Sequence, residues 1–117
     1  MEFLKNKKIK NNKKEINHEK DFVKKSEKIH NCSAIKLILF SLNGFPDRTV
    51  LCPGGRILFI EFKRSSKEKL TPNQDDWKTT LEGFGFTYRV AWSCDMALTI
   101  LEEFLNDTDP TRAVEIS

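Results

Sequence analysis

The chain has 117 residues, of which 38% are hydrophobic, and its formal net charge at pH 7 is +3. This length fits one domain with a small core and excludes two independent modules. Lysines and asparagines follow the opening Met1–Leu4, where a secretory signal would be apolar, and no stretch is apolar enough to predict a membrane span. We therefore expect an intracellular protein that does not contact membranes.

The inventory of reactive side chains also excludes several kinds of site. The three cysteines are too far apart in the sequence for a zinc knuckle or a Cys-x-x-Cys redox pair, and they are typical of a reduced cytosolic protein. With only two histidines, His18 and His30, a multi-histidine metal site or a Ser-His or Cys-His triad is not expected. Any catalysis should therefore depend on carboxylates and lysine.

Charge is unevenly distributed along the chain. Residues 1–36 contain 11 lysines and 5 acids, a balance of +6, whereas residues 37–117 contain 9 basic and 12 acidic residues, a balance of −3. Residues 1–15 are too rich in Lys and Asn to fold by themselves, and we expect a disordered basic arm. Such an arm could collect phosphates through counterion release, or it could reflect an AT-rich coding sequence without structural purpose.

The folded domain is expected to span residues 16–106, with residues 107–117 as a loose tail. Apolar residues at helical spacing predict a helix from Ile16 to His30. Ala34–Leu42 is rich in β-branched and apolar residues and is predicted to be a strand buried on both sides, which ends at the Asn43-Gly44 turn.

A β-hairpin is predicted next, with strands Arg48–Cys52 and Arg56–Lys63 joined by Pro53-Gly54-Gly55. The following helix should begin at Thr71, because Thr71 suits the N-cap, Pro72 the first helical position and Gln74 the third position of a capping box. Residues 86–92 alternate as a strand does, and a last helix should begin after a Ser93 N-cap.

The strand, helix and strand from Arg56 to Trp92 form a crossover unit, so these two strands should be parallel, whereas the hairpin before them is antiparallel. The predicted fold class is α/β, with a mixed sheet flanked by helices on both faces. The element order is αβββαβ, followed by the last helix.

The hairpin register brings ionisable groups together. If Cys52 lies opposite Arg56, then Asp47 lies opposite Glu61, and two carboxylates that face each other need a cation to neutralise them. Side chains alternate along a strand, so Lys63 should share the face of Glu61. Two carboxylates that hold Mg²⁺, with a lysine beside them and Gln74 within reach, are suited to phosphodiester hydrolysis.

Each piece of this pattern also has a structural explanation. Glu-x-Lys on a strand is often a solvent-facing charge pair, and Pro-Asp commonly opens a turn. Glu61, however, lies within the apolar strand Ile57–Lys63, where an ionised carboxylate costs free energy that an exposed pair would not. Four basic residues near the site could grip DNA phosphates or could be ordinary surface charge: Arg48, Arg64, Lys67 and Lys69.

The sequence resembles the VRR-NUC (virus-type replication-repair nuclease) branch of the PD-(D/E)XK nucleases from about Glu19 to Leu105. The resemblance rests on five motifs in the same order: Gly44-Phe45-Pro46-Asp47-Arg48, Gly54-Gly55-Arg56, Phe59–Arg64, Leu70-Thr71-Pro72-Asn73-Gln74 and Gly83-Phe84-Gly85-Phe86. The sequence departs from the family in two places. The segment Leu37–Asn43 is shorter and more apolar than the family's usual loop before Gly-x-Pro-Asp, and the N-terminus is rich in Lys and Asn.

The resemblance implies a restriction-endonuclease-like fold and DNA cleavage that depends on Mg²⁺ or Mn²⁺. The metal would be held by Asp47, Glu61 and the backbone carbonyl of Phe62, Lys63 would be the catalytic lysine, and Gln74 would match the family's glutamine. Glu19 fits the glutamate of the family's N-terminal helix and is a further candidate for the catalytic or metal-binding set.

The resemblance also bears on partners and setting. Stand-alone members are associated with homodimers that cut branched DNA such as four-way junctions, in recombination and repair. Short members come from phages or bacteria, which implies a cytoplasmic location, whereas the same module ends a eukaryotic repair nuclease, which would be nuclear. Two other functions remain open: a DNA-binding or partner-recruiting module that does not cut, and a small α/β interaction protein whose carboxylates are surface residues.

Overall fold

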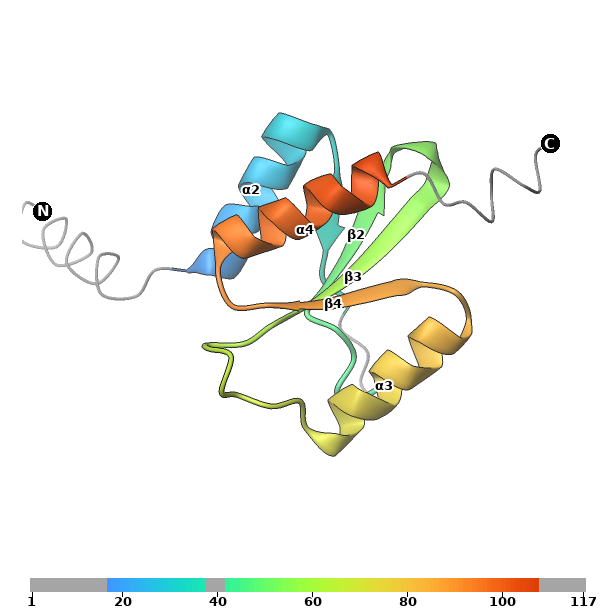
Figure 1. The fold of residues 1–117 in the computed structure, drawn as a ribbon. Helices are drawn as coiled ribbons and strands as arrows, with labels where there is room; N and C mark the ends of the chain where they lie inside the picture. Colours follow the sequence, from blue (N-terminus) through green and yellow to red (C-terminus); the bar gives the residue numbers. More distant parts are fainter. Residues whose placement is uncertain (1–16, 38–41, 108–117) are drawn as a thin grey trace, which may run out of the picture.

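A four-stranded mixed sheet and three helices make up the part of the chain that the computed structural model describes, residues 17–37 and 42–107. The predicted arm, residues 1–15, and all but the first residue of the predicted tail lie outside these residues. Figure 1 shows α2 and α4 together on one side of the sheet and α3 on the other. The predicted α/β class with helices on both faces is therefore confirmed.

The order of the elements along the chain is the expected αβββαβ followed by a helix. The elements are α2 (His18–His30), β1 (Ser33–Ile35), β2 (Arg48–Cys52), a 3₁₀ turn (Pro53–Gly55), β3 (Arg56–Phe62), α3 (Pro72–Gly83), β4 (Thr87–Ala91) and α4 (Cys94–Asn106). The strands lie side by side in the order β1-β2-β3-β4. β1, β2 and β3 pair antiparallel, and β3 pairs with β4 in parallel, as the crossover connection predicted.

Side-chain caps begin each of the three α-helices in residues 17–37 and 42–107. Thr71 and Gln74 form both hydrogen bonds of the predicted capping box at the start of α3. Ser93 caps α4 by accepting a hydrogen bond from the Met96 N–H at 3.0 Å. Asn17 caps α2 in the same way, by accepting from the Lys20 N–H at 2.9 Å. These local signals explain why the predicted helix starts agree closely with the structure.

The prediction of a long strand from Ala34 to Leu42, buried on both sides, was wrong. The strand is β1, an edge strand of three residues, Ser33–Ile35; Lys36, Leu37 and Leu42 are irregular, and residues 38–41 lie outside the described part. β1 pairs only as far as Thr49, and β2 itself begins at Arg48 after a bend at Asp47. β1 is therefore short because β2 offers no strand residue to pair with beyond Arg48. Apolar composition does not reveal this limit.

Because side chains alternate along β3, this strand contributes buried residues to a hydrophobic cluster on each face of the sheet. Leu58 and Ile60 are fully buried on the face that α2 and α4 cover, together with Phe22 of α2 and Leu101 of α4. Phe59 is buried on the α3 face in a smaller, aromatic cluster. None of the helices in the described ranges is both long and apolar enough to cross a membrane.

Candidate active site at the end of the hairpin

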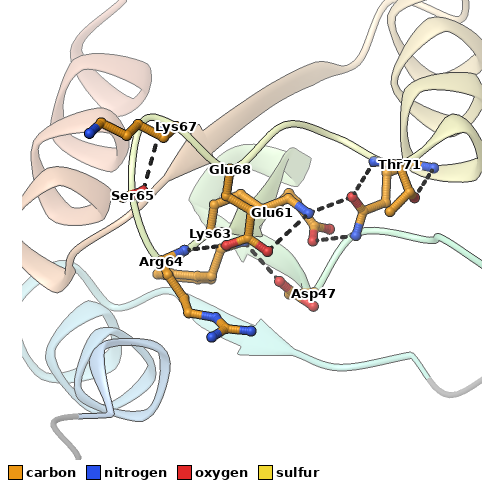
Figure 2. A network of polar contacts seen from close by, with 10 residues as sticks. Asp47, Glu61, Lys63, Arg64, Ser65, Lys67, Glu68 and Thr71 are labelled. Atoms are coloured by element: carbon orange, nitrogen blue, oxygen red, sulfur yellow. Dashed lines mark hydrogen bonds and ion pairs between the residues drawn. The ribbon is translucent and has the colours of Figure 1, made fainter.

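The β-hairpin has the predicted register, from Cys52 opposite Arg56 to Arg48 opposite Ile60. One further step along this register puts Asp47 opposite Glu61. The backbone ladder has ended at this point, and the Asp47 side chain takes its place: Asp47 Oδ2 accepts a hydrogen bond from the Phe62 N–H at 2.8 Å. The end of the hairpin thus holds Asp47 beside Glu61 (Figure 2).

Glu61 is a buried acid, with only 3% of the residue exposed. Its Oε2 accepts a hydrogen bond from Gln74 Nε2 at 2.9 Å, whereas its buried Oε1 has no hydrogen-bond partner. Buried polar atoms without partners are rare in folded proteins and call for an explanation, such as an absent ion or water. This burial also contradicts the alternative in which Glu61 is a surface residue.

The environment of Glu61 disfavours a second negative charge. Burial, followed by the negative charge of the neighbouring Asp47, raises the pKa of Glu61 to about 8 from 4.5, although the nearby Lys63 charge opposes this shift. Two adjacent carboxylates in a site with little water cannot both be ionised cheaply. In the protein alone, the pair therefore tends to retain a proton at neutral pH, and a bound cation would remove the reason to retain it.

The Lys63 amine is directed into the same site. Its side chain is only 6% exposed, and Nζ donates a hydrogen bond to Gln74 Oε1 at 2.6 Å. Gln74 Oε1 also accepts from the Thr71 N–H at 2.9 Å, so the amide nitrogen of Gln74 is left to face Glu61. Because these partners fix which end of the amide is oxygen, the amine and the buried carboxylate are held on either side of one side chain.

The loop before Asp47 approaches the start of α3 closely enough to require glycine. Gly44 has a φ of +89°, and a Cβ there would lie 2.7 Å from backbone and side-chain atoms of Asn73 and 2.9 Å from the Gln74 nitrogen. Phe45 then packs edge-on against Phe59 and Trp77, with ring centroids 5.8 and 5.0 Å apart. This contact sets the position of Asp47 relative to Gln74.

Replacing Gly44 with alanine is expected to destabilise the protein by about 2–4 kcal/mol, because the strain of a positive φ adds to a clash with backbone atoms. Gly54→Ala is the matched control, since Gly54 has a φ of +79° and nothing within 4 Å of the position of its Cβ. That variant should lose only about 1 kcal/mol. Chemical denaturation measures both losses, and equal losses would contradict the proposed close approach.

Glu19 does not join the other predicted site residues. It lies on α2, and its Oε2 accepts a hydrogen bond from Arg48 Nε at 2.6 Å. Arg48 pairs with Ile60, whose side chain faces α2, so this ion pair lies across the sheet from Glu61. Glu19 nevertheless lines a cavity that Lys63 also lines. A catalytic or metal-binding role for Glu19 stays a prediction.

The predicted DNA-contacting residues fall into two groups. Arg48 is largely covered by its pair with Glu19, whereas Arg64, Lys67 and Lys69 are exposed on the loop between β3 and α3. In Figure 2, the side chain of Lys67 extends away from Asp47 and Glu61. Their contact with DNA stays a prediction.

The structure adds two residues that the sequence did not single out. Glu68 Oε2 lies 3.9 Å from Lys63 Nζ, while Glu68 Oε1 accepts a hydrogen bond from the Arg64 N–H at 2.8 Å. The Nδ1 of His18 accepts a hydrogen bond from the Cys94 N–H at 3.1 Å. Glu68 lies in an irregular loop, and His18 is 76 residues from its partner, so no spacing rule could have found either contact.

The donor set at the end of the hairpin fits a divalent cation. Asp47 and Glu61 are hard oxygen ligands, and the partnerless Glu61 Oε1 offers a lone pair that no protein group uses. Among the residues that the structure describes, no three His, Cys, Asp or Glu side chains converge to form a metal site. Magnesium usually binds through one or two carboxylates and keeps several waters, so two acids are sufficient.

Of three comparisons with known proteins, one found a protein of similar fold. Neither a family model nor a curated protein matches the sequence. A solved structure described as a VRR_NUC domain superimposes with a TM-score of 0.64 and 24% sequence identity, over 73% of this chain and 91% of that one. The likeness shows a shared fold, and it agrees with the family to which the sequence motifs point.

Proposed function

We propose that this protein is a VRR-NUC-type nuclease that hydrolyses DNA with Mg²⁺ or Mn²⁺ as its cofactor and selects its substrate by structure. The observation that carries the proposal is the buried Glu61, which lies beside Asp47 and has one oxygen without a hydrogen-bond partner. The Gln74 side chain links Glu61 to the Lys63 amine through a hydrogen bond to each. The VRR_NUC fold of a solved neighbour supports a nuclease rather than another use of the same groups.

Asp47, Glu61 and the backbone carbonyl of Phe62 would hold the cation. When bound, a divalent cation there would polarise a phosphoryl oxygen and lower the pKa of a water molecule. Asp47 is held by the Phe62 N–H, and Glu61 is held by Gln74, so both carboxylates are oriented before the cation arrives. Such preorganisation removes part of the reorganisation cost of reaching the transition state.

Lys63 would act on the phosphate itself. Its ammonium group is held by Gln74 Oε1 and is largely withdrawn from solvent, so a phosphate oxygen that reached it would form a charge-assisted hydrogen bond. This contact would strengthen as negative charge develops on the phosphoryl oxygens. Glu68, at 3.9 Å, is the carboxylate that a phosphate would have to displace.

The proposed substrate is branched DNA such as a four-way junction, cut by a homodimer that places two sites in one particle. The exposed aromatic residues Phe84 and Phe86, at the end of α3 and the start of β4, offer apolar surface for a second copy. The exposed basic residues between β3 and α3 would contact phosphates of the same DNA.

A cleavage panel tests the proposal. Wild-type protein should cut at least one branched, flapped or nicked DNA when Mg²⁺ or Mn²⁺ is added and should not cut with a chelator. Asp47→Ala and Lys63→Ala should each reduce the rate by about 100-fold or more. Lys78→Ala, on the surface of α3, is the control and should cut normally. Equal rates in all four proteins would remove Asp47 and Lys63 from the mechanism.

The second candidate function is a DNA-binding or partner-recruiting module that keeps the nuclease fold without cutting. The excess of lysine in residues 1–36 favours it. Salt-dependent DNA binding without metal-stimulated cleavage on any member of the panel would select this function, and sedimentation of the same samples would show whether the binding species is a dimer.

A further inference from the structure

We propose that Trp92 is a stacking platform for an unpaired DNA base next to the phosphate that Lys63 contacts. This proposal deepens the proposed function and rests on it in one respect, because it places the phosphate at Lys63. The proposal specifies the substrate further. The protein would favour DNA in which a nucleotide next to the scissile bond is not base-paired.

The sheet puts Trp92 directly beside Lys63. β3 and β4 pair in parallel up to Phe62 opposite Ala91, and the Lys63 N–H donates to the Ala91 carbonyl at 2.8 Å. Trp92 directly follows β4, as Lys63 directly follows β3. An aromatic ring and an amine therefore emerge from neighbouring chain segments at the same end of the sheet.

Trp92 is not explained by the packing of the protein's interior. Trp77 packs edge-on against Phe45 and belongs to the α3-side cluster, whereas Trp92 belongs to neither core cluster among the described residues. Trp92 is 40% exposed. The exposed part of an indole ring beside a charged site has a cost in water that a ligand with an apolar face would remove.

A cavity lies where a nucleotide would have to sit. It has a volume of about 450 Å³ and is lined by Trp92, Lys63, Arg64 and Glu68 and by His18 and Glu19 of α2. Figure 1 shows the start of α2, the end of β4 and the loop after β3 on the same side of the molecule. The volume is in the range of small-molecule sites. The same indole borders a second cavity of about 690 Å³ that Lys69 and Leu70 also line.

The chemistry of this cavity fits one nucleotide better than a small anion. A nucleotide has an aromatic base that stacks on an indole, at about 1–3 kcal/mol per base, and a phosphate that pairs with lysine and arginine. Bases inside a duplex are already stacked and cannot reach a side chain without unpairing. A branch point or flap supplies the base without this cost, so Trp92 would discriminate branched from fully paired DNA.

Binding measured in a chelator tests the inference without any cleavage. Fluorescence anisotropy would compare a labelled, fully paired duplex with the same duplex carrying a short unpaired branch. Trp92→Ala should weaken binding to the branched DNA about tenfold and change binding to the duplex less than about twofold. Trp92→Phe, which keeps an aromatic face, should retain most of the affinity for the branched DNA.

Ile29→Ala is the matched control, because Ile29 is 59% exposed and lies roughly 16 Å along α2 from His18, which lines the cavity. It should bind both DNAs as the wild type does. Equal losses by Trp92→Ala on both DNAs, no loss on either, or a change in its sedimentation would overturn the inference. Since no metal is present, a wild type that never cuts DNA would refute the proposed nuclease without deciding this test.

Discussion

Replacing Glu61 with glutamine is expected to reduce metal-dependent cleavage by about a thousandfold and, at pH 8, to make the metal-free protein more stable. The first effect follows because the variant lacks a carboxylate ligand. The second follows because the wild type at pH 8 must either ionise a buried acid beside Asp47 or bind a proton to keep it neutral, and a neutral amide of the same size avoids both costs. A residue maintained at a cost to stability is typical of a functional site.

The matched control for this experiment is Glu82→Gln, at the far end of α3. Glu82 lies 3.8 Å from Lys78 at the surface, and such exposed pairs contribute little. Cleavage and urea denaturation of the three proteins at pH 8 give both readouts. A Glu61→Gln variant that unfolds more easily than the wild type would show that Glu61 is structural and would contradict the proposed role.

The free energy of unfolding of the metal-free protein is expected to fall as the pH rises from about 4.5 to about 8. The pKa of Glu61 is raised in the folded protein to about 8, above its ordinary value of 4.5, so between these values the folded state binds more protons than the unfolded state. Each unit of pH then costs up to about 1.4 kcal/mol, so the total over this window is at most about 5 kcal/mol. Outside this window the contribution is constant.

Added Mg²⁺ or Mn²⁺ should reverse this loss at pH 8, by about 2.7 kcal/mol when the metal is at 100 times its dissociation constant. A stabilisation of that size raises the melting temperature by roughly 10 °C or more in a domain of this length. The effect should be much smaller at pH 5.5, where protons compete for the carboxylates.

Thermal melts at several pH values, with and without metal, check both parts. At each pH, the difference between wild type and Glu61→Gln isolates the contribution of Glu61 from that of the other titratable groups. Melting temperatures that do not respond to metal at pH 8, or respond equally in Glu61→Gln, would contradict a cation site at Asp47 and Glu61.

The hairpin and helix starts could be predicted because short-range rules determine them. The length of the Pro53-Gly54-Gly55 loop sets the register, and the register brings Asp47 to Glu61 across the strands. Thr71 and Ser93 mark helix starts through hydrogen bonds only three residues long. A site built from such elements can be located before the fold is known.

Other features depend on tertiary contacts that no local pattern encodes. β1 is short because β2 begins at Arg48, although the apolar residues after Ile35 favour a longer strand. The pairing of Glu19 with Arg48 spans 29 residues and depends on how α2 crosses the sheet. Trp77 lies on α3 and packs, partly buried, against Phe45, whereas Trp92 follows β4 and is 40% exposed. This difference depends on how α3 lies on the sheet, and the neighbours of the two residues in the sequence do not reveal it.

The oxygen of the Gln74 amide serves two structures at once. It accepts from the Thr71 N–H, which completes the first turn of α3, and from Lys63 Nζ, which lies outside the helix. Turning the amide over would break both bonds and the one to Glu61, so no single contact can be lost alone. The formation of α3 and the alignment of the amine with the acids are therefore one cooperative event, and any condition that frays the first turn of α3 also separates the Lys63 amine from Glu61.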